Sequence, residues 1–134
     1  MVKEFPQESK DFHPFGELIG LKFDKLSKGF SQCSISVDEK MFNPHQVLHG
    51  AIMYGMADTG MGGALYTLIE DTEICATIEI KINFFKAVRH GKVTCKTKVI
   101  QKGKRIATLE SEIFNDKDLV AKALGTYSII EIKS

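Results

Sequence analysis

The sequence predicts an α+β fold in which an antiparallel sheet wraps around one long central helix. First, apolar residues between positions 52 and 69 recur at three- and four-residue steps, a pattern typical of a helix with one broad buried stripe. Second, two segments before this helix and four after it read as strands, most of them with alternating apolar and polar residues. Third, nearly all the connections are short, which favours hairpins and antiparallel pairing.

The composition fits a single globular domain over residues 1–134. The chain is 43% hydrophobic and 26% charged, and it shows no internal repeat or linker. Its formal net charge of +1 gives no electrostatic reason to expect nucleic acid or a membrane as a partner. Three scattered cysteines without a CxxC spacing argue against a disulfide framework or a zinc site. We therefore expect no metal and no cofactor.

Residues 1–16 are polar, contain two prolines, and are predicted to form an irregular extension or a short helix. They lack the apolar core of a signal peptide, and no apolar run in the chain is long enough to span a bilayer. The expected compartment is the cytoplasm. Two strands are then predicted over residues 18–26 and 30–42, around a turn at residues 27–29.

Four further strands are predicted after the helix, over residues 76–85, 91–100, 104–114 and 119–132. The first of them alternates strictly and places four apolar residues on one face: Ile78, Ile80, Ile82 and Phe84. Lysines 92, 96 and 98 of the next strand allow two interpretations. They could form a phosphate or nucleic-acid patch, but Glu110 and Glu112 should lie opposite Lys98 and Lys96. We therefore prefer cross-strand charge pairing.

Asp58 lies in the middle of this apolar helix, outside the centre of the buried stripe, where helix stability does not explain it. A helical wheel gives it six same-face neighbours, and half of them are Gly or Ala: Ala51, Tyr54, Gly55, Met61, Gly62 and Leu65. Small residues leave room for a ligand, another backbone or a second subunit beside the carboxylate. The alternatives are a solvated Asp and glycines that serve tight packing.

The helix is predicted to begin near His49-Gly50. Its first turn presents unpaired backbone N–H groups, which can bind an anion or a polarised carbonyl oxygen. Asn43 precedes it in an Asn-Pro pair, and the sequence leaves open whether it serves the turn or the chemistry.

The pattern of Asn43, His49-Gly50 and Asp58 resembles the hotdog-fold acyl-CoA thioesterases, and it is most similar to their phenylacetate-pathway (PaaI-like) branch. Those proteins carry an N-x5-H-G-G-x6-D motif. The spacings match, with six residues from Asn43 to His49 and nine from His49 to Asp58. The resemblance extends over the later strands and covers nearly everything after about residue 20. It implies a sheet wrapped around the helix, with active sites shared between two subunits of a homodimer, and a homotetramer as the expected larger assembly.

The resemblance also implies roles for individual residues. Asp58 would activate or orient the attacking water, or attack directly. The N–H of Gly50 would bind the thioester oxygen, Asn43 would hold the water or the carbonyl, His49 would shape the loop, and Thr77 would line the site. The CoA phosphates would need cations near the pocket mouth, and four loop residues are candidates for this: Lys86, Arg89, Lys104 and Arg105.

Two residues depart from the family pattern. Ala51 replaces the second glycine of the motif, and Ala87 replaces a proline after the next strand. Neither change removes a residue to which the resemblance assigns chemistry. The chemistry needs few residues, because a thiolate leaves readily and no general acid is strictly needed. The expected activity is hydrolysis of an aryl- or fatty-acyl-CoA. The alternatives are a non-catalytic acyl-CoA binding or sensing domain and, ranked last, a hotdog hydratase or dehydratase.

Overall fold

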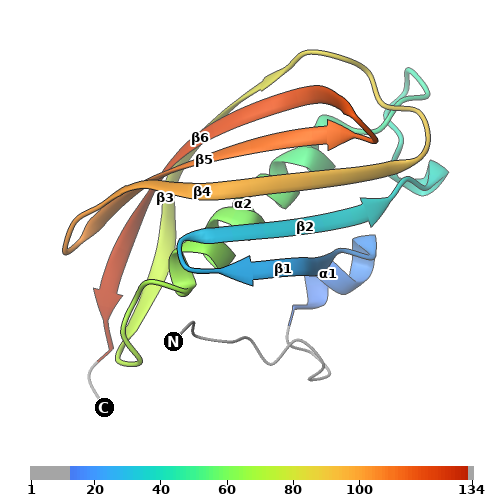
Figure 1. Cartoon of the computed structure of the whole chain (residues 1–134). Coiled ribbons are helices and arrows are strands. Elements are labelled where there is room, and N and C mark those ends of the chain that lie inside the picture. Colours follow the sequence, from blue (N-terminus) through green and yellow to red (C-terminus); the bar gives the residue numbers. More distant parts are fainter. Residues whose placement is uncertain (1–12, 133–134) are drawn as a thin grey trace.

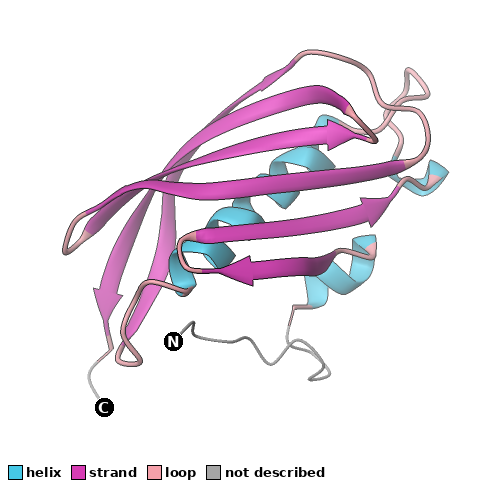
Figure 2. Cartoon of the chain, viewed as in Figure 1, coloured by secondary structure: helices cyan, strands magenta, loops and turns pink. Residues whose placement is uncertain are grey.

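A six-stranded antiparallel sheet curves around one long helix, α2, in the computed structural model of the protein, which describes residues 13–132 (Figures 1 and 2). The predicted α+β architecture is thereby confirmed. In chain order the elements are α1 (Pro14–Ile19), β1 (Lys22–Ser27), β2 (Phe30–Ser36), the 3-10 helix η1 (Glu39–Met41), α2 (Gly50–Tyr66), β3 (Glu73–Phe84), β4 (Lys92–Lys102), β5 (Ile106–Asn115) and β6 (Asp118–Glu131).

The strand order in the sheet is β1-β2-β4-β5-β6-β3, and every neighbouring pair is antiparallel. The chain therefore leaves the β1-β2 hairpin through α2 and re-enters the sheet at its far side with β3. This path makes β1 and β3 the two edges of the sheet. β3 is 12 residues long, and among residues 13–132 no further strand pairs with its outer side.

The prediction for the N-terminal part was wrong at residues 18–21, because a helix stands where the strand was expected to begin. Pro14 occupies a first-turn position of α1, where its fixed φ suits a helix. Gly20 ends α1 in the left-handed conformation, with φ of 69°, and β1 begins only at Lys22. Residues 1–12 lie outside the described residues, so the extension predicted there stays a prediction.

Two other predicted elements end earlier than expected. β2 stops at Ser36 rather than continuing to residue 42, since the Asp38 side chain accepts a hydrogen bond from the Lys40 N–H and starts η1. α2 stops at Tyr66 rather than at residue 69. There the Thr67 hydroxyl donates to the Ala64 carbonyl and accepts from the Gly29 N–H.

The buried stripe of α2 packs into the concave face of the sheet, as predicted. Met56, Ala57, Met61 and Leu65 are completely buried there. The helix approaches the sheet most tightly at Gly60, whose carbonyl accepts a 2.6 Å hydrogen bond from the Ser31 hydroxyl. A Cβ at this position would lie 2.8 Å from Thr97 Oγ1, so the close approach requires glycine.

The strict alternation predicted for β3 was wrong at one residue. The register with β6 shifts between Thr77 and Glu79, so Ile78 forms a bulge and is 53% exposed. Ile80 and Ile82 resume the pattern after the bulge and pack against the core, as expected. The bulge is the local irregularity that sets the positions of the residues before it, including Thr77.

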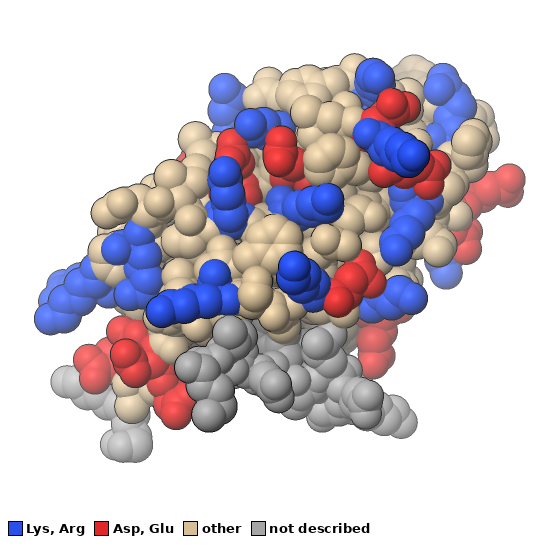
Figure 3. Space-filling model, in the orientation of Figure 1, with Lys and Arg blue, Asp and Glu red and all other residues tan. Residues whose placement is uncertain are grey.

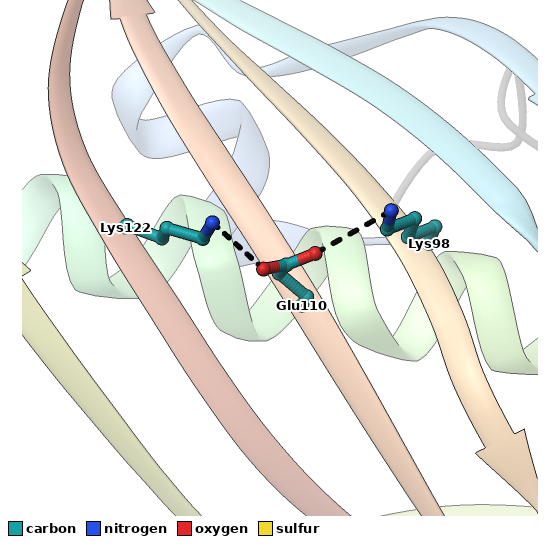
Figure 4. Close-up of polar contacts among 3 residues, drawn as sticks. All are labelled: Lys98, Glu110 and Lys122. Carbon is teal, nitrogen blue, oxygen red and sulfur yellow. Dashed lines mark ion pairs between the residues drawn. The ribbon is translucent and has the colours of Figure 1, made fainter.

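The β4-β5 register is the predicted one, with Lys98 opposite Glu110 and Lys96 opposite Glu112. The predicted charge pairing is observed for Lys98, whereas Lys96 Nζ lies 5.3 Å from the centroid of the Phe114 ring. The Glu110 carboxylate lies 3.6 Å from Lys98 Nζ and 2.9 Å from Lys122 Nζ of β6 (Figure 4). The hydrogen bond from Lys122 lowers the pKa of Glu110.

Candidate active site

Asp58 lies in the middle of α2 and is anchored by two hydroxyl groups of the sheet. Thr77 Oγ1 donates a 2.6 Å hydrogen bond to Asp58 Oδ1. Tyr127 Oη lies 2.5 Å from the same oxygen and 2.7 Å from the main-chain oxygen of Asp58. The structure thus brings together two residues that the sequence proposed, Asp58 and Thr77, and adds a third that it did not.

The two hydroxyl residues come from neighbouring strands at one level of the sheet. Thr77 of β3 and Tyr127 of β6 are direct register partners, so their side chains share the helix-facing side. The bulge at Ile78 follows immediately and ends this register. The bulge therefore fixes where Thr77 meets Asp58, in the way that bulges re-aim side chains beside functional sites.

Tyr127 is a buried hydrogen-bond donor. The residue is 2% exposed, and this burial is the largest cause that raises the pKa of its hydroxyl far above the ordinary value. The hydrogen bond with the Asp58 carboxylate raises it further. Tyr127 consequently keeps its proton throughout the physiological pH range.

A cavity of about 310 Å³ opens beside the Asp58 carboxylate. Its lining is mainly small or apolar: His13, Phe23, Asp58, Thr59, Gly62, Gly63, Cys75, Ala76, Thr77 and Tyr127. The prediction that small residues leave room beside Asp58 holds for Gly62, around whose Cβ position there is open space. It does not hold for Gly55, which the Phe15 ring of α1 covers. Met61 and Leu65, the large predicted neighbours on the Asp58 face, lie in the core.

The N-terminus of α2 is capped by His49, and the N–H of Gly50 lies beyond this cap. His49 Nδ1 accepts a 2.9 Å hydrogen bond from the Ala51 N–H, and the His49 carbonyl accepts from the Ile52 N–H. His49 is thus the cap of α2, in agreement with its expected role of shaping the loop. The N–H of Gly50 has no partner in this part of the chain, so it is available as a donor.

Gly50 is also the residue on which an aromatic ring rests. A Cβ at Gly50 would lie 2.9 Å from Cζ of Phe84, which is 49% exposed at the end of β3. Any larger residue would displace either the ring or the first turn of α2. Glycine therefore keeps this donor in place next to an apolar wall.

Asn43 stabilises the turn before α2, which is one of the two roles that the sequence left open for it. Its side-chain oxygen accepts a 2.8 Å hydrogen bond from the His45 N–H, as in an Asx-turn. The amide nitrogen, Nδ2, donates to no residue of the described range. Asn43 and Gly50 line a second cavity of about 450 Å³, with the rest of its wall mostly apolar: Val47, Leu48, Met53, Phe84, Phe85, Lys86 and Ala87.

The structure does not bring Asp58 together with Asn43 and Gly50 within one chain. The two cavities share no lining residue. Gly50 and Asp58 are separated by eight helical residues, which corresponds to about 12 Å along the axis of α2. A single chain therefore holds two separate halves of the predicted site.

The four candidate cations for CoA lie at two opposite ends of the sheet. Lys86 lines the cavity of Asn43 and Gly50 and lies 3.8 Å from the Asp118 carboxylate, and Arg89 is exposed three residues further on. Lys104 and Arg105 are exposed in the β4-β5 turn. On the face shown in Figure 3, basic and acidic side chains are largely interspersed. The roles of these four residues stay predictions.

Sequence reasoning missed Tyr127, His13 and Phe23 at the Asp58 cavity. A signal for Tyr127 was available, because its strand alternates and places it among inward-facing small residues. A buried tyrosine usually needs a hydrogen-bond partner. His13 and Phe23 carried no such signal, since their positions depend on how α1 and β1 pack against α2.

No group of three or more His, Cys, Asp or Glu side chains within residues 13–132 is placed to hold a metal ion. Within the same range, none of the helices has the length and apolar character needed to cross a membrane.

Comparison with known proteins agrees with this architecture. Residues 45–122 match the model of the thioesterase superfamily. A provisionally named esterase of Saccharolobus solfataricus is 34% identical over 112 residues, covering 83% of this chain and 74% of the relative. The medium/long-chain acyl-CoA thioesterase YigI of Salmonella typhimurium is 23% identical over 132 residues, covering 87% and 85%.

The fold is also that of the E. coli PaaI protein from the phenylacetic acid degradation operon. The two structures align with a TM-score of 0.82 and 22% identity, covering 90% of this chain and 88% of that one. The chain therefore belongs to the thioesterase superfamily, as a thioester hydrolase with the hotdog fold.

Proposed function

We propose that this protein is an acyl-CoA thioesterase that releases a free acid and CoA. The observation that carries the proposal is the Asp58 carboxylate, which is held by Thr77 and Tyr127 at the edge of a largely apolar cavity. The motif that contains Asp58 and the acyl-CoA thioesterase among the relatives support the same substrate class.

The proposed reaction uses few groups. Asp58 takes a proton from a water molecule while the water oxygen attacks the thioester carbonyl carbon. The negative charge that develops on the carbonyl oxygen is stabilised by the unpaired N–H of Gly50 at the positive end of α2. When the C–S bond breaks, the CoA sulfur leaves as a thiolate, which takes up the proton. Direct attack by Asp58 is the alternative first step.

The separation of Gly50 from Asp58 supports a site shared between two chains. Asp58 of one chain would face Asn43 and Gly50 of its partner, as the resemblance implies. The edge strand β3 suits such pairing, because its outer side is unpaired and several large apolar residues along it are exposed: Ile74, Ile78, Phe84 and Phe85. A homodimer, within a homotetramer, is the proposed assembly.

The acyl group is expected in the apolar space beside Asp58, and the CoA phosphates near cations at the mouth of the joined cavities. Lys86 is the best-placed of the four candidates, since it lines the cavity of Gly50. The apolar lining suits both an aryl group and a medium-length alkyl chain. Relative rates of thiol release from the two kinds of acyl-CoA ester identify the acyl group.

The test is thiol release from a panel of phenylacetyl-, hydroxybenzoyl- and straight-chain acyl-CoA esters, with wild type and Asp58→Asn run together. Loss of a general base should lower kcat by about 10²- to 10⁴-fold while acyl-CoA binding persists. Asp71→Asn is the control, because Asp71 is an exposed aspartate after α2 that lines neither cavity. Binding without turnover by the wild-type protein would contradict the proposal and favour a non-catalytic acyl-CoA sensor.

A further inference from the structure

Tyr127 carries out no step of the proposed reaction, yet its hydroxyl contacts both the main chain and the carboxylate of Asp58. The single hydroxyl proton is shared between the main-chain oxygen and Oδ1 of Asp58, at 2.7 and 2.5 Å. Both acceptors belong to one residue of α2, 69 positions away in the sequence. Tyr127 therefore ties the carboxylate to the backbone of its own helix.

The two oxygens of the Asp58 carboxylate are in unequal surroundings. Oδ1 receives hydrogen bonds from Thr77 and Tyr127, whereas Oδ2 receives none from the rest of residues 13–132. Rotation of the carboxylate would break both bonds to Oδ1 at once. This asymmetry assigns different tasks to the two oxygens.

We propose that Tyr127 is a positioning residue which, together with Thr77, anchors Oδ1 of Asp58 so that Oδ2 is the oxygen that meets the attacking water. This inference rests on the proposed thioesterase function. A carboxylate held in one orientation does not populate unproductive rotamers. The conformational entropy of orienting the base is then lost on folding and not during the reaction.

The surroundings of Tyr127 indicate that its hydroxyl serves this contact rather than packing. The ring is part of the core, and phenylalanine would fill the same volume without a polar group that must be satisfied. Because burial keeps the hydroxyl protonated, Tyr127 remains a donor over the whole working pH range. Tyr127 borders the Asp58 cavity with only 2% of its surface exposed, and its hydroxyl is directed at Asp58.

The other titratable groups that line the Asp58 cavity are few. Cys75 faces it from β3 and His13 from the residue before α1, and the lining contains no Lys or Arg among the described residues. The carboxylate is thus held by neutral hydroxyl dipoles and not by an ion pair. Removal of one hydroxyl therefore removes a donor that no Lys or Arg of the described lining can replace.

The experiment compares wild type with Tyr127→Phe, Thr77→Val and the double variant. Tyr54→Phe is the matched control, because Tyr54 is an exposed tyrosine on α2 that does not line the cavity. Steady-state kinetics at one fixed pH with the best acyl-CoA ester give kcat and KM separately. The ¹³C NMR chemical shift of the Asp58 carboxyl carbon, measured at the same pH, reports the loss of a hydrogen-bond donor without turnover, so it is informative even if the thioesterase proposal fails.

We expect Tyr127→Phe to lower kcat roughly 10- to 100-fold with KM changed less than about threefold. At one fixed pH the ¹³C resonance of the Asp58 carboxyl carbon should move, since the carboxylate loses a hydrogen-bond donor. The double variant should lose more activity than either single variant.

An unchanged ¹³C chemical shift in Tyr127→Phe would overturn the inference, as would a loss of activity that only follows a loss of melting temperature. If Tyr127→Phe does not fold, Thr77→Val decides, because it breaks the same anchor from β3. An unchanged chemical shift in that variant overturns the inference too.

Discussion

Gly50 and Asp58 lie on the same helix, yet they line two cavities that have no residue in common. With a rise of 1.5 Å per residue, their eight-residue separation places them about 12 Å apart along the axis. A thioester carbonyl cannot reach the Gly50 N–H and the Asp58 carboxylate of one chain at the same time. The proposed chemistry therefore requires each catalytic centre to combine residues of two chains.

Complementation between two inactive variants tests this shared site. Asp58→Asn and Gly50→Ala, each defective alone, are coexpressed with different tags, and the mixed pair is purified through both tags. In the mixed pair one site carries both defects and the other carries none, so about half of the wild-type turnover should return. If each site lies within one chain, the mixed pair stays inactive, and the shared-site proposal is wrong.

Gly50→Ala alone should lower kcat roughly 10- to 100-fold, because the donor at the start of α2 is displaced. The added Cβ would meet the Phe84 ring at 2.9 Å, so ring and helix end must separate. Phe84→Leu in the same chain should make room and restore part of the activity. Ala51→Gly, which adds no atom beside the ring, is the control, and its kcat should stay within about threefold of wild type.

A lack of recovery in the Gly50→Ala/Phe84→Leu variant, together with a normal melting temperature, would show that the ring is not the reason for glycine at this position. The comparison is made by thiol-release kinetics and by thermal unfolding of the same preparations.

The sequence was sufficient to predict the helix, most of the strands and the pairing of β4 with β5. The apolar residues of α2 recur at three- and four-residue steps, which is a local property of the sequence. The alternation in β4 and β5 and the short turn between them are local too, and they place Lys98 opposite Glu110. The end of α1 was predicted as the beginning of a strand because short apolar runs such as Leu18-Ile19 fit either period. Pro14 in the first turn and the left-handed Gly20 at the C-terminus make this segment a helix.

The contact between Tyr127 and Asp58 was beyond sequence reasoning for a different reason. Alternation can place Tyr127 on the inward face, but it does not say which helix residue lies opposite. That position depends on the β3-β6 register, which shifts at the Ile78 bulge. Likewise, the separation of Gly50 from Asp58 follows from helix geometry. The functional consequence of this separation depends on how a second chain would pair with the first.

Glu110→Gln should lower the melting temperature by a few degrees at most, because exposed ion pairs contribute little. Lys122 lowers the pKa of Glu110, so the contribution is present above the unfolded-state pKa of about 4.3 and is lost as the pH falls. High salt should shrink the effect. Glu112→Gln is the control, since Glu112 forms no ion pair with residues 13–132. Equal melting temperatures of the two variants at neutral pH and low salt would contradict the prediction.

The buried Tyr127 hydroxyl should make the fold sensitive to alkali. In the unfolded chain a tyrosine loses its proton near pH 10, whereas in the folded chain burial and the Asp58 carboxylate raise the pKa of Tyr127 well above that value. Above about pH 10 the folded state therefore binds more protons than the unfolded state, so the free energy of unfolding falls as the pH rises. Tyr127→Phe lacks this proton and should lose less stability between about pH 10 and 11 than wild type. Urea unfolding at several pH values measures the difference, with Tyr54→Phe expected to follow the wild-type curve. Parallel curves for wild type and Tyr127→Phe would mean that the hydroxyl ionises as easily in the folded chain as in the unfolded one.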